Sequence, residues 1–199
     1  IRHAAPFPPL RAVRIGLQIA RALGAAHAKR IIHRDLKPDN VFLIDRDGRP
    51  DFVKIVDFGI AKIQPAEGAT LEPKLTRAGA VFGTPEYMAP EQAAGKSDTD
   101  HRIDVYALGT MLYEMVCGRT PHTSDSALRT ITMQIIEPIV PPSRAVPGLD
   151  LPPALEAAIM AALAKDKDAR TPTMGDIVAA LEPIAAQLEV GRVPALVRL

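Results

Sequence analysis

Two short strings in the first third of the chain contain residues that could do chemistry together. Residues 33–40 read His-Arg-Asp-Leu-Lys-Pro-Asp-Asn, and residues 57–59, seventeen positions after Asn40, read Asp-Phe-Gly. The strings offer carboxylates, an ammonium group and an amide, which are groups used for proton transfer and for binding hard metal ions. Any one of these residues alone would more often cap a turn or face solvent. The combination at this spacing is not expected by chance.

The two strings resemble the catalytic loop and the magnesium-binding motif of protein kinases, in the form typical of bacterial serine/threonine kinases of the Hanks type. A third string, residues 83–91, reads Gly-Thr-Pro-Glu-Tyr-Met-Ala-Pro-Glu and resembles the end of the kinase activation segment. The resemblance covers about residues 8–188. It implies transfer of the γ-phosphoryl group of ATP to protein hydroxyls. Lys37 and Thr84 favour serine and threonine over tyrosine as acceptors.

The resemblance implies a separate role in ATP binding or phosphoryl transfer for each of five residues. Asp35 orients the substrate hydroxyl and accepts its proton, and Lys37 stabilises the charge of the γ-phosphate. Asn40 and Asp57 hold the magnesium ions that bridge the phosphates, and Phe42 covers one face of the adenine. The implied ligands are therefore ATP and Mg²⁺, with Mn²⁺ as an alternative metal.

Other residues of the motifs have implied structural roles. His33 and Phe58 pack in the column of side chains that joins the two lobes of a kinase. Gly59 permits the backbone turn that follows the metal ligand. For His33 and Phe58, ordinary core packing is an alternative that differs little from this role.

Arg34 directly precedes the expected catalytic base, which is typical of kinases that are switched on by phosphorylation of the activation loop. Its guanidinium would pair with the new phosphate. Thr76, seven residues before Gly83, is a better candidate acceptor than Thr70. Ala78 stands where resembling bacterial kinases often have a second threonine, so double phosphorylation is not expected. The alternative is that both threonines are ordinary polar loop residues.

The third string and the residues after it imply a framework for the site. Thr84 would contact Asp35 and Lys37 and help to shape the substrate site. Glu91 should be buried and therefore needs a partner, which the family supplies at the position of Arg170. Asp104 would accept backbone hydrogen bonds from the catalytic loop, although an aspartate at a helix start is ordinarily an N-cap. The sequence is compatible with both roles of Asp104, as an acceptor for the catalytic loop and as a helix N-cap.

The composition is that of one soluble globular domain. The chain has 199 residues, 47% of them hydrophobic, and a net charge of +1, which gives no reason to expect binding to nucleic acid or to an anionic membrane. Its single cysteine excludes an internal disulfide, and it contains no long apolar run that could span a bilayer. We expect a cytoplasmic location, with room for a membrane anchor outside this segment.

Hydrophobic periodicity predicts a mainly helical fold with one β-hairpin. The hairpin is expected from the short apolar runs at residues 41–44 and 52–56, which flank a turn-forming segment. A long loop is expected over residues 60–90, which are rich in glycine and proline. The helices are expected at residues 10–29, 102–117, 124–136, 152–164 and 173–188.

This order of elements is similar to the large, C-terminal lobe of a kinase, with the hairpin carrying the catalytic and metal-binding loops. Residues 1–188 would form that lobe, truncated at its N-terminus, and residues 189–199 a tail or linker. The small β-rich N-lobe is absent from the sequence: no Gly-x-Gly-x-x-Gly string occurs in it. The strand lysine and helix glutamate of that lobe also have no counterpart here. We expect the missing lobe in the same polypeptide.

Catalysis by an open half-site should be negligible, because phosphoryl transfer relies on preorganised charge in a water-excluded site. The chain alone is therefore expected to be inactive. The alternative function is a non-catalytic orphan lobe that acts as a docking or scaffold module. A small-molecule phosphotransferase of kinase-like fold is a third reading, disfavoured because the Asp-Phe-Gly and Ala-Pro-Glu strings are both present.

Overall fold

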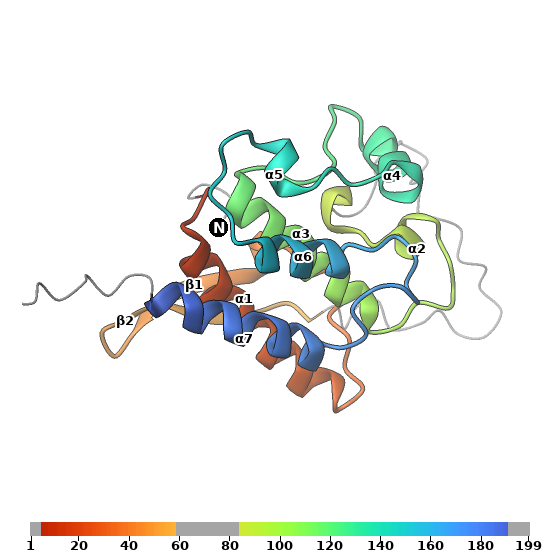
Figure 1. Ribbon diagram of the computed structural model, residues 1–199. Helices are drawn as coiled ribbons and strands as arrows, with labels where there is room; N and C mark the ends of the chain where they lie inside the picture. Colours follow the sequence, from red (N-terminus) through yellow and green to blue (C-terminus); the bar gives the residue numbers. More distant parts are fainter. Residues whose placement is uncertain (1–4, 59–83, 191–199) are drawn as a thin grey trace, which may run out of the picture.

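Helices dominate the part of the chain that this computed structural model describes, which is residues 5–58 and 84–190 (Figure 1). The one described sheet is a two-stranded antiparallel hairpin. In chain order the elements are α1 (Pro9–His27), η1 (Pro38–Asn40), β1 (Val41–Arg46), β2 (Arg49–Ile55), η3 (Pro85–Tyr87), α2 (Pro90–Ala93), α3 (Arg102–Cys117), α4 (Ala127–Ile136), α5 (Pro142–Ala145), α6 (Pro153–Ala162) and α7 (Met174–Val190).

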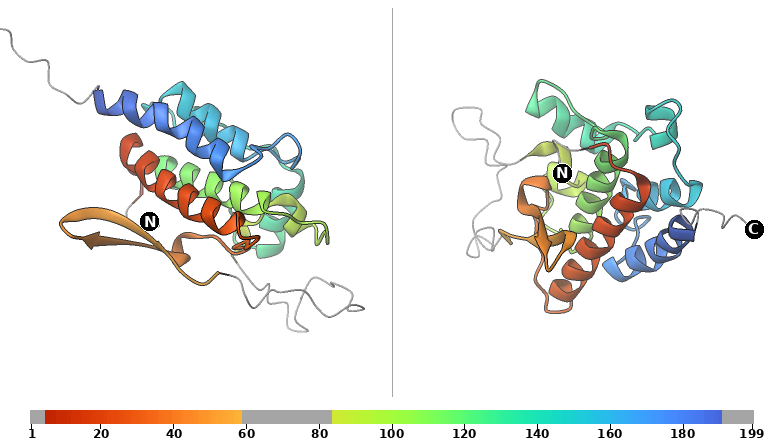
Figure 2. Two further views of the ribbon diagram at one scale, coloured as in Figure 1. Left: turned by 90° about the horizontal axis from the view of Figure 1, so that it is seen from below. Right: turned by 90° about the vertical axis from the view of Figure 1, so that its left-hand side faces the viewer.

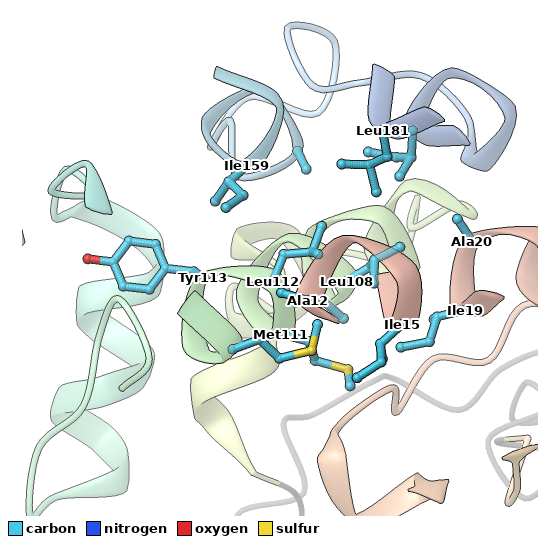
Figure 3. Packing of buried hydrophobic residues seen from close by; sticks show 14 of the residues in the cluster. Ala12, Ile15, Ile19, Ala20, Leu108, Met111, Leu112, Tyr113, Ile159 and Leu181 are labelled. Carbon is cyan, nitrogen blue, oxygen red and sulfur yellow. The ribbon is translucent and has the colours of Figure 1, made fainter. Parts of the chain in front are cut away.

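The helix α3 lies at the centre of the molecule. Every residue from Ile103 to Val116 is buried, as expected for a helix that is apolar nearly all round. Its neighbour α1 is amphipathic and buries nine residues, and Figure 3 shows Ile15 of α1 beside Met111 of α3. Burying side chains of this size stabilises the fold by roughly 1.5–3 kcal/mol each.

The C-terminal helices cover one side of this pair. Helix α7 packs against α1 and α6 packs against α3, so that Leu181 and Ile159 lie over the central core (Figure 3). The contact between α3 and α6 is close because of Gly109: a Cβ there would lie 2.9 Å from the Cβ of Ala162. Real Cβ atoms do not approach one another this closely, so a side chain at Gly109 would push the two helices apart.

The hairpin lies on the opposite side of α1 from α7 (Figure 2). Its register pairs Val41 with Ile55, and the chain bulges between Ile44 and Arg46. Gln18 of α1 ties the hairpin down, because its amide nitrogen donates to the Asp51 carbonyl at 2.9 Å and its amide oxygen accepts from the backbone N–H of Val53 at 3.1 Å. The helix therefore fixes the orientation of β2.

The mainly helical fold with a small hairpin is confirmed, and the predicted helices match the described ones to within three residues at each end. The weak capping box predicted for α7 is present, since Thr173 Oγ1 accepts from the Asp176 backbone N–H at 3.1 Å. The short helices α2 and α5 were not predicted, because four-residue helices carry too little periodicity. Among the described helices, none is both long enough and apolar enough to span a membrane.

Candidate functional site

The loop that follows α1 brings three of the predicted site residues together. The ammonium of Lys37 lies 3.4 Å from Oδ2 of Asp35. Asn40 is buried, and its amide nitrogen donates to the Asp35 carbonyl at 2.8 Å. The side chain of Asn40 thus locks the backbone of Asp35 in place. A carboxylate and an ammonium group are held at the same end of the hairpin by short, local contacts.

Asn40 and Asp57 flank the hairpin and lie at the same end of it. Asn40 immediately precedes β1, and its carbonyl accepts from the backbone N–H of Val56, just before Asp57, at 3.0 Å. Since the amide nitrogen of Asn40 is used on Asp35, its amide oxygen is left for another partner. Two oxygen ligands from protein suit Mg²⁺, which takes its remaining ligands from water and phosphate. The residues present therefore fit the metal that the motif implies.

Asp104 is the buried anchor of this loop. Its two carboxylate oxygens accept from the backbone N–H groups of His33 at 2.8 Å and Arg34 at 2.9 Å, and His27 Nε2 contacts one of them at 2.8 Å. The N–H groups come from consecutive residues, so the carboxylate fixes the direction of the chain immediately before Asp35.

This anchor holds an unfavourable backbone conformation. Arg34 has φ of 66° and Asp57 has φ of 53°, both in the left-handed region that non-glycine residues rarely occupy. Such residues persist only where the surroundings determine them, and they concentrate at functional sites. Around Arg34 those surroundings include Asp104 on its N–H and Gln92, whose amide nitrogen donates to its carbonyl at 3.1 Å.

The capping role considered for Asp104 is wrong. Helix α3 begins at Arg102, and it is Asp100 that accepts from the Arg102 backbone N–H, at 2.9 Å. Asp104 lies two residues inside the helix, so its carboxylate is directed to the catalytic loop. The guanidinium of Arg102 also hydrogen-bonds Asp100 and lowers the pKa of that carboxyl to about 2.

His33 and Phe58 are in contact, with ring centroids 4.8 Å apart. His33 is fully buried and its Nε2 lies 3.0 Å from the Val56 carbonyl, so this ring links the loop before Asp35 to the end of β2.

Phe42, expected to cover adenine, has 52% of its surface exposed on β1. The predicted Gly59, Thr70 and Thr76 lie outside the described residues.

A cavity of about 170 Å³ opens beside Asp35. Residues 34–36 line one side of it, and Thr84, Tyr87 and Met88 line another. Thr84 thus lines the same cavity as Asp35, while its expected contact with Lys37 stays a prediction. The segment that leads from Thr84 into α2 forms a wall next to the candidate catalytic loop.

Arg170 and Glu91 fix the far end of that wall. The guanidinium donates to both carboxylate oxygens of Glu91, at 2.7 and 2.9 Å, and the Arg170 side chain is fully buried. Its remaining donors reach the carbonyls of Ala164 at 3.0 Å and Arg102 at 2.9 Å. The pair expected from sequence is therefore present, and the guanidinium is hydrogen-bonded on several sides, as a buried charge requires.

Three further contacts around the site were not predicted. The Tyr87 hydroxyl donates to Glu114 Oε2 at 2.5 Å inside the core, Gln92 donates to the Arg34 carbonyl, and His27 contacts the Asp104 carboxylate. Glu114 could have been found from sequence, because an acid inside an apolar helix needs a buried donor. No comparable signal distinguishes Gln92 or His27.

Comparison with known proteins places this geometry in a family. The protein kinase domain family matches residues 1–178. Serine/threonine-protein kinase pkn3 of Myxococcus xanthus is 48% identical over 161 residues, which are 81% of this chain and 29% of that protein. Serine/threonine-protein kinase Pkn1 of the same species is 43% identical over 170 residues, covering 85% of this chain and 23% of Pkn1.

Mycobacterial proteins are also similar. Serine/threonine-protein kinase PknH of Mycobacterium bovis is 41% identical over 180 residues, which are 90% of this chain and 28% of PknH. The chain thus spans under a third of the length of each of these relatives. The matched region includes all the motifs described above. The chain belongs to the protein kinase domain family, in its bacterial, Hanks-type serine/threonine branch.

Proposed function

We propose that residues 1–188 form the large lobe of a kinase that transfers the γ-phosphoryl group of ATP to serine and threonine hydroxyls of proteins. The observation that carries the proposal is the position of Asp35. Its carboxylate lies 3.4 Å from the Lys37 ammonium, its backbone carbonyl accepts from Asn40, and Asp35 lines the same cavity as Thr84. A phosphoryl-transfer site needs this combination of acceptor carboxylate, cationic partner and substrate wall.

In the proposed mechanism Asp35 acts on the acceptor. Its carboxylate hydrogen-bonds the hydroxyl of the incoming serine or threonine, orients that oxygen for in-line attack and takes its proton as the new bond to phosphorus forms. Asp104 contributes indirectly, by fixing the chain before Asp35. Because the loop is anchored before substrate arrives, little reorganisation is needed during the reaction.

Lys37 would stabilise the negative charge on the transferred group, since its ammonium lies beside Asp35 rather than in bulk solvent. Asn40 and Asp57 would hold Mg²⁺ through their side-chain oxygens. The metal neutralises phosphate charge when it is bound. The hairpin keeps the two ligands in register, through the Val56–Asn40 backbone hydrogen bond.

Phosphorylation of peptide libraries by the full-length gene product tests this function. We expect incorporation of ³²P from ATP into serine- and threonine-containing peptides and little into matched tyrosine peptides. Asp35→Asn should reduce kcat by at least about 10²-fold, because general-base contributions are of that size. A matched control is Asp47→Asn at the hairpin turn, an exposed aspartate outside the site. Transfer that is equal in Asp35→Asn and wild type would refute the proposal.

We further propose that residues 1–199 alone are inactive, and that the remaining groups that bind the ATP phosphates lie elsewhere in the same polypeptide. The exposed Phe42 and Ile44 of β1 support this, since they offer an apolar surface for a second lobe. The competing function is a docking module without catalysis. Sequencing the DNA upstream of the Ile1 codon separates the two: an open frame with a glycine-rich loop favours the enzyme, and a stop codon favours the docking module.

A further inference from the structure

Gln134, near the end of α4, is a buried polar residue to which the proposed function gives no role. Only 1% of its surface is exposed. Its amide nitrogen donates to two consecutive backbone carbonyls, those of Pro85 at 3.2 Å and Glu86 at 2.6 Å. Both carbonyls belong to the short turn that follows Thr84, 48 or more residues earlier in the chain. One side chain thus connects α4 to the cavity wall.

The conformation of this turn depends on contacts from outside it. Within the described residues, Glu86 Oε2 is buried without a hydrogen-bond partner, which is unfavourable for the conformation of this turn. The local backbone hydrogen bonds of this turn include those from Tyr87 N–H to Thr84 at 3.3 Å and from Met88 N–H to Pro85 at 3.2 Å. These are long for N–H···O bonds. The Tyr87 hydroxyl, which donates to Glu114, anchors the side chain of this turn, and the two bonds from Gln134 add direct restraint on its backbone carbonyls.

Gln134 is itself held in place. Its amide oxygen accepts from the Tyr106 hydroxyl of α3 at 2.6 Å, which fixes the side-chain orientation and leaves the nitrogen to face the wall. Behind this pair, the Lys165 ammonium donates to the backbone carbonyl of Gln134 at 2.7 Å and to that of Met133 at 3.2 Å. His122 Nε2 lies 3.1 Å from the same ammonium. The network runs from α3 through α4 to the turn.

We infer that Gln134 is a positioning residue for the protein substrate: it holds the turn after Thr84 so that the cavity beside Asp35 keeps the shape that receives the residues next to the phosphorylated hydroxyl. This inference rests on the proposed kinase function. It makes α4 a determinant of peptide recognition without requiring α4 to touch the peptide. Nucleotide binding should be independent of it, since Asn40 and the chain just before Asp57 are held by other contacts.

Gln18 provides a matched control. It is also a glutamine on a helix, and its side-chain amide hydrogen-bonds the backbone of Asp51 and Val53 in the hairpin. Replacing either glutamine by methionine preserves its approximate shape and removes two or more hydrogen bonds. The two variants therefore differ chiefly in which segment loses its hydrogen bonds: the turn after Thr84 in Gln134→Met and the hairpin in Gln18→Met.

The decisive experiment measures steady-state kinetics of the full-length gene product with ATP and its best peptide from a serine/threonine library. Gln134→Met should raise the KM for peptide by roughly fivefold to thirtyfold, as expected for two lost hydrogen bonds, and leave the KM for ATP within about twofold. Tyr106→Phe should produce a smaller change in the same direction. Gln18→Met should leave the KM for peptide unchanged.

A second measurement does not depend on activity. Amide hydrogen exchange of Gln134→Met should be faster than that of wild type at Tyr87 and Met88, whereas Gln18→Met should accelerate exchange in β2. A wild-type product that transfers no phosphate would overturn the proposed function. Active wild type with unchanged peptide KM in Gln134→Met, or with equal changes in the KM for peptide and ATP, would overturn only this inference. Unchanged exchange at Tyr87 and Met88 would overturn it as well.

Discussion

Two buried carboxylates hold the two halves of the candidate site, and they do so in different ways. Asp104 accepts from two backbone N–H groups, with His27 as a third contact. Glu91 is bound at both oxygens by the guanidinium of Arg170. Both join segments at least 70 residues apart, but the first fixes the backbone conformation of two consecutive residues, whereas the second pairs two side chains. We therefore expect loss of Asp104 to affect catalysis first, and loss of Glu91 or Arg170 to affect stability first.

The largest effect is expected from Arg170→Met. This change leaves the Glu91 carboxylate buried without its cation, which costs about 3–5 kcal/mol in the free energy of unfolding. Chemical denaturation of the full-length gene product would measure it. The double variant Glu91→Leu/Arg170→Met should recover most of the loss, because a buried ion pair can be replaced by packed apolar residues at little cost. A double variant that is less stable than Arg170→Met would contradict this view of the pair.

Asp104→Asn should separate activity from stability. The asparagine keeps one acceptor oxygen but directs its NH₂ group at the backbone N–H of either Arg34 or His33, so the loop before Asp35 loses one of the two hydrogen bonds that anchor it. Misplacement of Asp35 by about 1 Å is expected to lower kcat by roughly 10²-fold. Steady-state kinetics and a thermal melt on the same sample test this. A large loss of stability with normal kcat in the folded fraction would remove the distinction between the two carboxylates.

How much of the site could be read from the sequence depends on whether a residue stands at a position of a recognisable motif. Asp35, Asn40 and Asp57 were found because they stand in contiguous strings. Gln134 and Gln18 were not found, because neither stands in a motif and glutamine is ordinarily an exposed residue. Asp104 was read only in part: the start of α3 at Arg102 was predicted correctly, but the sequence did not show that Asp100 accepts from the Arg102 N–H. The motifs thus predicted the candidate site residues and the Glu91–Arg170 pair, whereas the contacts made by Gln18 and Gln134 became visible only in the structure.

A smaller effect is expected at the regulatory position, where Arg34 lines the cavity beside Asp35. We propose that phosphorylated Thr76 binds the Arg34 guanidinium and orders the adjacent wall. Thr76→Ala should then lower the activity of the autophosphorylated protein by about fivefold, the lower range of such coupling. Thr70→Ala is the control and should retain activity. Equal activity of Thr76→Ala and wild type after incubation with ATP would exclude this regulation.

The smallest effect concerns pH and the start of α3, where Asp100 pairs with Arg102. The hydrogen bond from Arg102 lowers the pKa of Asp100 from 3.8 to about 2. Because the folded state favours the ionised form, this stabilisation is complete above about pH 4 and is lost as the pH falls through about 2. Asp100→Asn should cost about 0.5–1 kcal/mol at pH 7, the range for a partly exposed pair. Denaturation curves should show this difference narrowing toward pH 2, and a constant difference would contradict the assignment.

The hairpin turn has a practical consequence. Asp45 Oδ1 accepts from the Gly48 N–H at 3.1 Å, and Asp47 and Gly48 both have positive φ, so the reversal is closed by its own residues. Asn40 and Asp57 lie at the opposite end of the ribbon, where backbone pairing sets their separation. The tip is therefore a permissive insertion point. A fluorescent label or affinity tag placed there would leave the reacting groups in register and would be accessible from solvent.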